Sequence, residues 1–203
     1  MENNVLAIIT GPPGAGKSTI GKRLAQDLAL PFFSKDPIKE ILAETLGWDD
    51  PSWSKRFGMA SINIMFHLVE RELLVQRAVI IESAFIPTFD ASRLGALHRQ
   101  YRCELLQIYC TATPHVLYDR FRKRVESGNR HPIHSEVEQL PSYEQFMKTY
   151  CTGRHGRLNI GGAYIEIDTT VPEQVAYQTV LTFLSSGLHH GGAKLETLPE
   201  VSA

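Results

Sequence analysis

The apolar residues of the chain fall into two alternating patterns. Short runs in which most positions are apolar predict strands at Val5–Thr10, Phe32–Ser34, Ala78–Ser83, Glu104–Cys110 and Tyr164–Asp168. Strands that are apolar on both faces are typical of a parallel sheet covered by helices on each side. The pattern therefore favours an α/β fold.

The longer segments between these runs carry apolar residues at helical spacing. They predict helices at Ser18–Ala29, Pro37–Leu46, Ser54–Gln76, Asp90–Tyr101, Pro114–Glu126, Tyr143–Tyr150 and Pro172–Leu184. In the first helix Ile20, Leu24 and Leu28 lie four residues apart, which gives one apolar stripe suited to packing on a sheet. Regular alternation of strand and helix predicts a parallel sheet with helices on both faces.

Composition narrows the class of protein. The 203 residues contain 21 Lys and Arg against 22 Asp and Glu, which argues against a surface built for the nucleic-acid backbone. The apolar run Val5–Ile9 is too short for a signal peptide or a membrane span, and three unpaired-looking cysteines fit a reducing compartment. We therefore expect a soluble cytoplasmic protein with no membrane partner, whose oligomeric state the sequence leaves open.

The stretch "GPPGAGKS" that follows the first strand matches the pattern G-x-x-x-x-G-K-[ST] and leads into an amphipathic helix. Pro12 and Pro13 offer no N–H, so the donors of a phosphate cradle must come from the amides after them. The expected nucleotide-binding residues are Gly11, Gly14, Ala15, Gly16, Lys17, Ser18 and Thr19. Lys17 places a charge on the β- and γ-phosphates and the Ser18 hydroxyl ligates Mg²⁺, so we expect ATP and Mg²⁺ to bind here.

With this loop and three weaker segments between Ile8 and Thr170, the chain resembles the P-loop kinases of the AAA-type ATPase domain family, which include polynucleotide-kinase-like and zeta-toxin-like phosphotransferases. The resemblance implies a three-layer P-loop NTPase fold, with a parallel five-stranded sheet in the order 2-3-1-4-5. It also implies a kinase domain at residues 1–187 with a helical lid at about 113–141. Residues 188–203 lack apolar periodicity, so we expect a flexible tail there.

The second segment, "FFSKDPIKEIL", resembles the kinase signature S-x-D-x-x-[RK], with Ser34, Asp36 and Lys39 at the matching positions. The resemblance implies that Asp36 accepts the proton of the attacking hydroxyl and that Asp36 and Lys39 contact the substrate. Asp36 could instead cap the helix that opens at Pro37.

The third segment, "AVIIESAFIP", ends a strand in Glu82, at a position where relatives use Asp or Glu to hold Mg²⁺. Because a buried carboxylate is costly without a partner, a metal explains Glu82 well. The resemblance makes Phe85 and Arg93 substrate contacts, with packing or surface exposure as the alternatives. Arg56 on the long central helix is a further candidate for the acceptor site.

The fourth segment, "TPHVLYDRFRKRVESGNRHPIH", resembles the lid of these kinases. Leu117, Phe121 and Val125 form a buried stripe, and Arg120 and Arg124 flank it without an acidic neighbour at helical spacing. By resemblance these two arginines, together with Arg130, stabilise the transferring phosphoryl group. His131 and His134 lie in the same segment, either as ordinary lid residues or as a metal pair.

These observations predict an ATP-dependent kinase that phosphorylates a hydroxyl of a small molecule whose identity the sequence does not give. Two alternatives stay open. One is a polynucleotide 5'-hydroxyl kinase, which needs a basic, aromatic-lined track. The other is a nucleotide-binding ATPase switch that has no phosphate acceptor.

Overall fold

A five-stranded parallel sheet forms the centre of the molecule, with strand order β2-β3-β1-β4-β5. The computed structural model describes residues 4–128, 130–134, 140–152, 156–171 and 173–189. The strands are β1 (Val5–Thr10), β2 (Phe32–Ser34), β3 (Val79–Glu82), β4 (Glu104–Thr111) and β5 (Ala163–Asp168). The helices are α1 (Lys17–Asp27), α2 (Lys35–Leu46), α3 (Ser52–Leu74), α4 (Pro87–Tyr101), α5 (Pro114–Glu126), α6 (Tyr143–Phe146), the π-helix η2 (Met147–Cys151) and α7 (Glu173–His189). The predicted fold class and strand order are confirmed.

Several helices begin earlier or end later than predicted. α2 starts at Lys35, so Pro37 lies inside its first turn, where a missing N–H does no harm. α4 starts at Pro87, and the carboxylate of Asp90 accepts a hydrogen bond from the Ile86 amide at 2.7 Å. α7 continues to His189, so residues 188 and 189 belong to a helix, and the rest of the expected tail lies outside the described residues.

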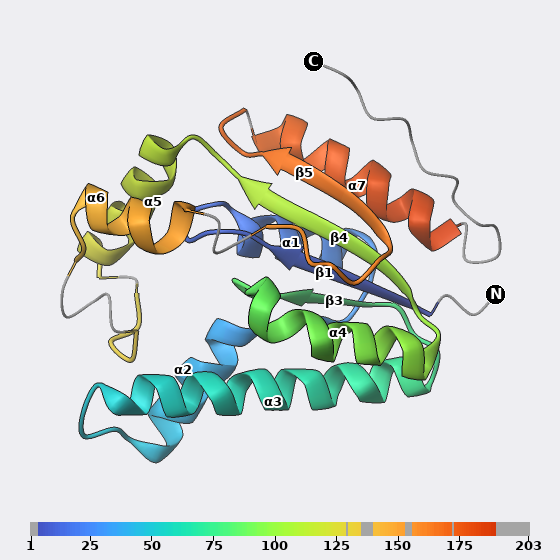
Figure 1. Ribbon diagram of the computed structural model, residues 1–203, viewed down its shortest axis with the longest axis horizontal. Helices are drawn as coiled ribbons and strands as arrows, with labels where there is room; N and C mark the ends of the chain where they lie inside the picture. The colour runs from blue at the N-terminus through green and yellow to red at the C-terminus, as the bar shows by residue number, and fades with distance from the viewer. Residues whose placement is uncertain (1–3, 129, 135–139, 153–155, 172, 190–203) are drawn as a thin grey trace.

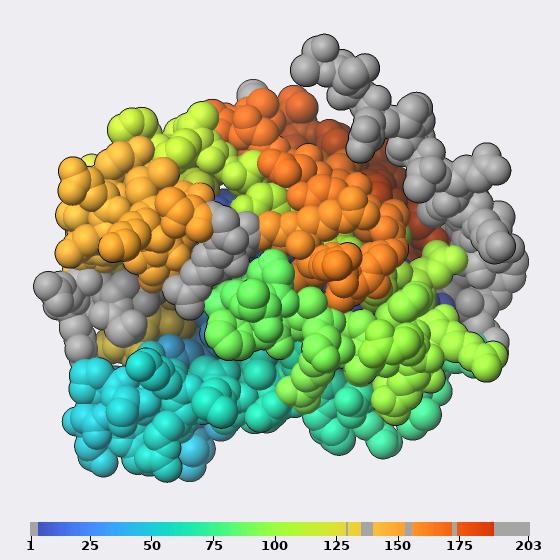
Figure 2. All heavy atoms as spheres, in the orientation of Figure 1, coloured from blue at the N-terminus to red at the C-terminus, as the bar shows by residue number. Residues whose placement is uncertain are grey.

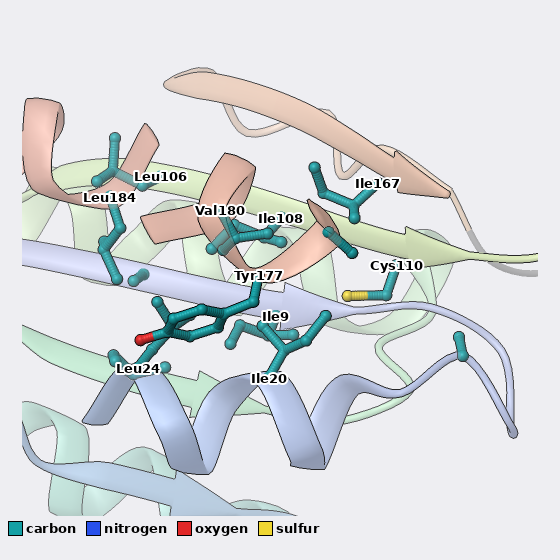
Figure 3. Packing of buried hydrophobic residues seen from close by; sticks show 14 of the residues in the cluster. Ile9, Ile20, Leu24, Leu106, Ile108, Cys110, Ile167, Tyr177, Val180 and Leu184 are labelled. Carbon is teal, nitrogen blue, oxygen red and sulfur yellow. The ribbon is translucent and has the colours of Figure 1, made fainter. Parts of the chain in front are cut away.

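Two apolar clusters hold the layers together, one on each face of the sheet. On one face Ile9 of β1 packs with Ile20 and Leu24 of α1 and with Tyr177 and Val180 of α7 (Figure 3). On the other face, Leu6 and Ile8 pack with α3 and α4 through Phe66, Val69, Leu73, Leu94 and Leu97. Successive side chains of β1 thus point alternately into the two cores. This explains why every residue of that strand is buried.

The carboxyl ends of the strands all point toward the end of the molecule where α2, α5 and α6 lie (Figure 1). In Figure 2, the atoms of α6 and η2 and those of the α2–α3 region form the two sides of this end. Ligands of open α/β sheets bind outside the carboxyl ends of the strands. Within the described part of the chain, no helix is both long and apolar enough to cross a membrane.

Candidate active site

The loop between β1 and α1 has the backbone conformation that its glycines permit. Gly14 and Gly16 have φ of 83° and 75°, and Gly16 is the N-cap of α1. At Gly14 a Cβ would lie 2.4 Å from the carbonyl oxygen of Leu117, because α5 packs directly on the loop. The helix therefore begins at Lys17 with its first amides facing the loop, which is the arrangement that binds anions.

Lys17 lies buried beneath this loop. Its Nζ donates a hydrogen bond to the carbonyl oxygen of Pro12 at 2.9 Å. Burial lowers the pKa of the ammonium, against the opposing charge of Glu82. A phosphate group beside Lys17 would therefore supply the counter-charge that burial makes favourable.

Gly11 and Ala15 depart from the sequence-based expectation. Both are buried, and neither lines the cavity of about 400 Å³ that lies between this loop, α2 and α5. The Ala15 amide, expected to be a phosphate donor, donates to the carbonyl oxygen of Pro12 at 3.3 Å. Gly11, with φ of 140°, is required for another reason: a Cβ there would lie 2.0 Å from the carbonyl oxygen of Cys110 in β4. In this structure Ala15 therefore stabilises the turn of the loop, and Gly11 allows the loop to pass close to β4.

Glu82, at the end of β3, links two hydroxyl groups. Its Oε2 accepts hydrogen bonds from Ser34 Oγ at 2.6 Å and from Ser18 Oγ at 3.0 Å. The side chains come from the ends of β2 and β3 and the start of α1, which meet because β2 and β3 pair in register with Ser34 opposite Glu82. The result is a nearly buried carboxylate with hydroxyl oxygens beside it, a set of hard oxygen donors.

Asp36 forms an ion pair with Arg130, with 2.8 Å between Oδ2 and Nη1. Burial opposes ionisation of Asp36, but the charges of Arg130 and His134 outweigh it and hold the pKa of this carboxyl far below its usual range. The N-cap of α2 is Ser34, so the alternative that Asp36 caps the helix is wrong. The N-cap lies two residues before Asp36. Asp36 is in the first turn of α2, and its carboxylate pairs with Arg130.

The segment 130–134 lies along α2 through further contacts. His134 Nε2 is 2.8 Å from Glu40 Oε1, and His131 Nε2 is 3.7 Å from Glu44 Oε1. Asp36, Glu40 and Glu44 are spaced four residues apart, so they form one acidic stripe on α2. Burial and the charge of Arg130 lower the pKa of His134, against the pull of Asp36 and Glu40. Both histidines are therefore held by carboxylates of α2.

Arg120 and Arg124 of α5 both line the cavity, as the helical-wheel argument predicts. Arg120 Nη2 donates to the carbonyl oxygen of Thr169 at 2.8 Å, and its Nη1 donates to Thr169 Oγ1 at 3.0 Å. These bonds tie α5 to the turn after β5. A smaller cavity of about 220 Å³ lies on that side, lined by Gly16, Thr19, Ile20, Arg120, Thr169 and Ala176.

Most of the predicted site residues share one cavity of about 400 Å³. Those that line it are Gly14, Gly16, Lys17, Ser18, Thr19, Asp36, Lys39, Glu82, Arg120, Arg124 and Arg130. Pro13, Lys35, Ser83, Ala84 and Tyr150 line it as well, although the sequence did not mark any of them as a site residue. His134, which the sequence indicated as a lid residue or as one of a metal pair, also lines the cavity. Lys35 precedes Asp36 and Ser83 follows Glu82, so their positions next to predicted site residues could have indicated them. Tyr150 comes from η2, and no sequence pattern indicated that it lines the cavity.

Three predicted substrate contacts lie elsewhere. Phe85 is fully buried in the apolar cluster below α3 and α4, with its ring 6.5 Å from that of Phe66. Arg93 stacks on the Phe66 ring at 4.1 Å and donates to Asn63 Oδ1, and Arg56 stacks on Trp53 at 4.2 Å. None of the three lines the cavity, because aromatic partners hold the arginines and the core holds the phenylalanine.

Comparison with known proteins places this site in a family. The family model described as "AAA domain" matches residues 6–148. A crystal structure from Chloroflexus aurantiacus, of a protein assigned as a kinase, is 32% identical, with a TM-score of 0.82 over 92% of this chain and 99% of the other.

Two curated relatives are shikimate kinases. The enzyme of Corynebacterium jeikeium is 28% identical over 141 residues, which is 68% of each protein. That of Rhodococcus jostii is 70% identical over 34 residues, 17% of this chain and 20% of its own length. The chain thus aligns with only about a fifth of the length of this relative.

Proposed function

We propose that this chain, which belongs to the AAA domain family and within it to the P-loop kinases, transfers the γ-phosphate of ATP to a hydroxyl group of a small molecule. One observation carries the proposal. The phosphate loop, the carboxylate–hydroxyl set around Glu82 and the Asp36–Arg130 pair all line the same cavity. In a kinase, the Asp36 carboxylate of this pair would face the acceptor hydroxyl at the phosphate site.

On the nucleotide side, the amides of Gly14, Gly16, Lys17 and Ser18 receive the phosphates, and the Lys17 ammonium neutralises them. Thr19 and Arg120 line both cavities, so the nucleoside extends from the larger cavity toward Thr169. Arg120 and Arg124 bring positive charge to the transferring group from α5, in the region 113–141 that we propose to act as a lid.

The oxygen donors at Ser18 and Glu82 fit Mg²⁺. A magnesium ion there would neutralise phosphate charge, and Mg²⁺ sites commonly use one or two carboxylates together with phosphate oxygens and water. In the described part of the chain, no three His, Cys, Asp or Glu side chains gather into a metal site. The metal would therefore depend on Ser18, Glu82 and the nucleotide itself.

On the acceptor side, Asp36 receives the proton of the attacking hydroxyl. The carboxylate is ionised at neutral pH, so it can accept a hydrogen bond and orient the nucleophile. Arg130, which now pairs with Asp36, is placed to compensate the negative charge between the two substrates.

The test is transfer of label from γ-labelled ATP to a collection of hydroxyl-bearing metabolites, with wild-type protein and the Asp36→Asn variant. We expect at least one phosphorylated product from the wild type, and a rate lower by roughly 10²–10⁴ in the variant. The matched control is Asp119→Asn on α5, whose carboxylate is half-exposed and lies 3.8 Å from Arg122.

Wild-type transfer by Asp36→Asn would refute the role of Asp36. Hydrolysis of ATP without any phosphorylated small molecule would instead favour the ATPase switch. Transfer to oligonucleotide 5'-ends would favour the polynucleotide kinase.

A further inference from the structure

A buried serine hydroxyl lines the larger cavity. Ser83 directly follows Glu82 at the end of β3, and only 7% of its surface is exposed. Its side chain makes no hydrogen bond to any residue in the described part of the chain. Because a buried hydroxyl costs free energy unless it is hydrogen-bonded, we expect a molecule that binds in the cavity to supply the partner of Ser83.

The hydroxyls around Glu82 have a different role. Ser18 and Ser34 both donate to Oε2 of Glu82, at 3.0 Å and 2.6 Å. Ser83 is the chain neighbour of Glu82, but among the described residues it takes no part in this set. The proposed binding of magnesium and phosphate therefore uses Ser18 and leaves the Ser83 hydroxyl for another group.

The segment that carries Ser83 is held in place by its backbone. The Ser83 amide donates to the carbonyl oxygen of Ile9 at 3.3 Å, and the Phe85 amide donates to Thr10 Oγ1 at 3.1 Å. The Phe85 ring is fully buried and anchors the segment in the core. The Ser83 hydroxyl is therefore presented from a fixed position, as a group that selects a ligand has to be.

The strand pairing relates Ser83 to Asp36. Ser34 lies opposite Glu82 in the register of β2 and β3, and neighbouring strands are about 5 Å apart. The residues that follow, Asp36 and Ser83, thus leave the edge of the sheet from adjacent points, and both line the cavity. A small molecule whose reacting hydroxyl contacts Asp36 can place a second oxygen, a few bonds away, at Ser83.

We propose that Ser83 determines acceptor specificity: its hydroxyl binds an oxygen on the carbon next to the one whose hydroxyl is phosphorylated. The inference rests on the proposed kinase function and specifies its substrate class, compounds with oxygen groups on neighbouring carbons. A serine hydroxyl both donates and accepts hydrogen bonds, so it fits a hydroxyl or a carbonyl oxygen and gains nothing from a C–H group in the same place.

The first experiment compares acceptors with and without the neighbouring oxygen, using wild-type protein, γ-labelled ATP and Mg²⁺. D-ribose, D-glucose, glycerol, D-glycerate and any acceptor found in the screen described above are each compared with their single-deoxy derivatives. We expect at least one parent compound to exceed the derivative that lacks the neighbouring oxygen by about tenfold or more in kcat/KM, because that derivative leaves the Ser83 hydroxyl unpaired.

The second experiment uses Ser83→Ala, which removes only the hydroxyl. We expect kcat/KM for the parent compound to fall about tenfold, and the difference from its deoxy derivative to narrow to about twofold. The KM for magnesium ATP should stay within about twofold of the wild type. Ser92→Ala, at an exposed position of α4, is the matched control and should keep the full difference.

Stability separates this role from a structural one. Without ligand, Ser83→Ala should melt at or above the temperature of the wild type, because the hydroxyl it loses has no hydrogen bond to a described residue. A lower melting temperature would indicate that the serine supports the fold, and would contradict the inference.

Equal transfer to every parent compound and its derivatives, or no transfer to any of them, would overturn the inference. So would an unchanged preference in Ser83→Ala, or a loss that appears in the KM for magnesium ATP instead of the acceptor. The proposed function is judged separately in the same samples. If a hydroxyl compound is phosphorylated whether or not Ser83 is present, the kinase reaction stands and only the acceptor class is wrong. If magnesium ATP does not bind, the proposed function fails.

Discussion

Single residues of this protein carry constraints that composition does not reveal. Gly21, in the middle of α1, is an example, since glycine in a helix normally costs about 1 kcal/mol relative to alanine. A Cβ at Gly21 would lie 2.6 Å from the Phe32 ring and 3.2 Å from Ile9 Cδ1. The glycine therefore lets α1 approach β1 and β2 closely, which in turn places Ser18 beside Glu82.

We expect Gly21→Ala to lower the free energy of unfolding by about 1 kcal/mol or more, because the clash with Phe32 exceeds the gain in helix propensity. Gly58→Ala in α3 is the matched substitution, since a Cβ there would be 3.8 Å from Lys35 Cε, an ordinary contact. It should raise the free energy by roughly 0.5–1 kcal/mol. Urea unfolding measures both, and equal effects from the two substitutions would contradict the packing argument.

The sequence predicted individual residues well where a local motif defined them. Lys17, Ser18 and Glu82 lie where the loop and the strand end indicated, because these positions follow from chain connectivity alone. Phe85 and Arg93 were placed by analogy with a loop next to the acceptor. Their actual surroundings depend on the Phe66 ring of α3, a distant element whose orientation no local pattern encodes.

At the scale of elements, the acidic stripe of α2 holds the segment 130–134. The spacing of Asp36, Glu40 and Glu44 is visible in the sequence, but their partners are not. Arg130 and His134 each lie 94 residues further along the chain than the carboxylates they contact. Helix boundaries, similarly, were predicted within a few residues. The π-helical turn η2, which brings Tyr150 to the cavity, has no comparable sequence signal.

His134 makes this contact sensitive to pH. Among the described residues, the charged and titratable groups that face it are Asp36, Lys39 and Glu40 on α2 and Arg130 on its own segment. Its pKa is lower in the folded protein than the usual value of about 6.5, so between these two values the unfolded chain binds more protons. Its contribution is therefore fully present above about pH 6.5 and is lost as the pH falls toward the folded value.

We expect wild-type protein to lose more free energy of unfolding between about pH 7.5 and pH 5.5 than His134→Gln does. Glutamine can still donate a hydrogen bond to Glu40 but does not titrate. His67→Gln, at an exposed position of α3, is the control and should follow the wild type. Urea titrations at the two pH values give the result. If His134→Gln lost as much stability as the wild type, the buried histidine would not be the titrating group.

At the scale of the whole molecule, a nearly neutral chain concentrates positive charge in one cavity. The formal net charge is −1, although six cationic side chains and two carboxylates line the cavity among the described residues. The composition argued against a surface for nucleic acids, and it could not reveal this local excess, which the fold creates by bringing α1, α2 and α5 to the carboxyl edge of the sheet (Figure 1). Lys17 is one of the most buried of these charges.

Binding of magnesium ATP should therefore stabilise the whole fold, and Lys17→Met should separate stability from binding. At a ligand concentration about 100-fold above Kd the stabilisation is about 2.7 kcal/mol, which raises Tm by roughly 5–10 °C in a protein of this size.

Because burial disfavours the Lys17 ammonium, we expect Lys17→Met without ligand to be at least as stable as the wild type. It should lose nearly all of the rise with magnesium ATP, whereas the exposed Lys22→Met should keep it. Thermal unfolding with and without nucleotide measures both effects. A full rise in Lys17→Met would mean that the phosphates bind without this ammonium, and that the charge buried under the loop serves the fold instead of the nucleotide.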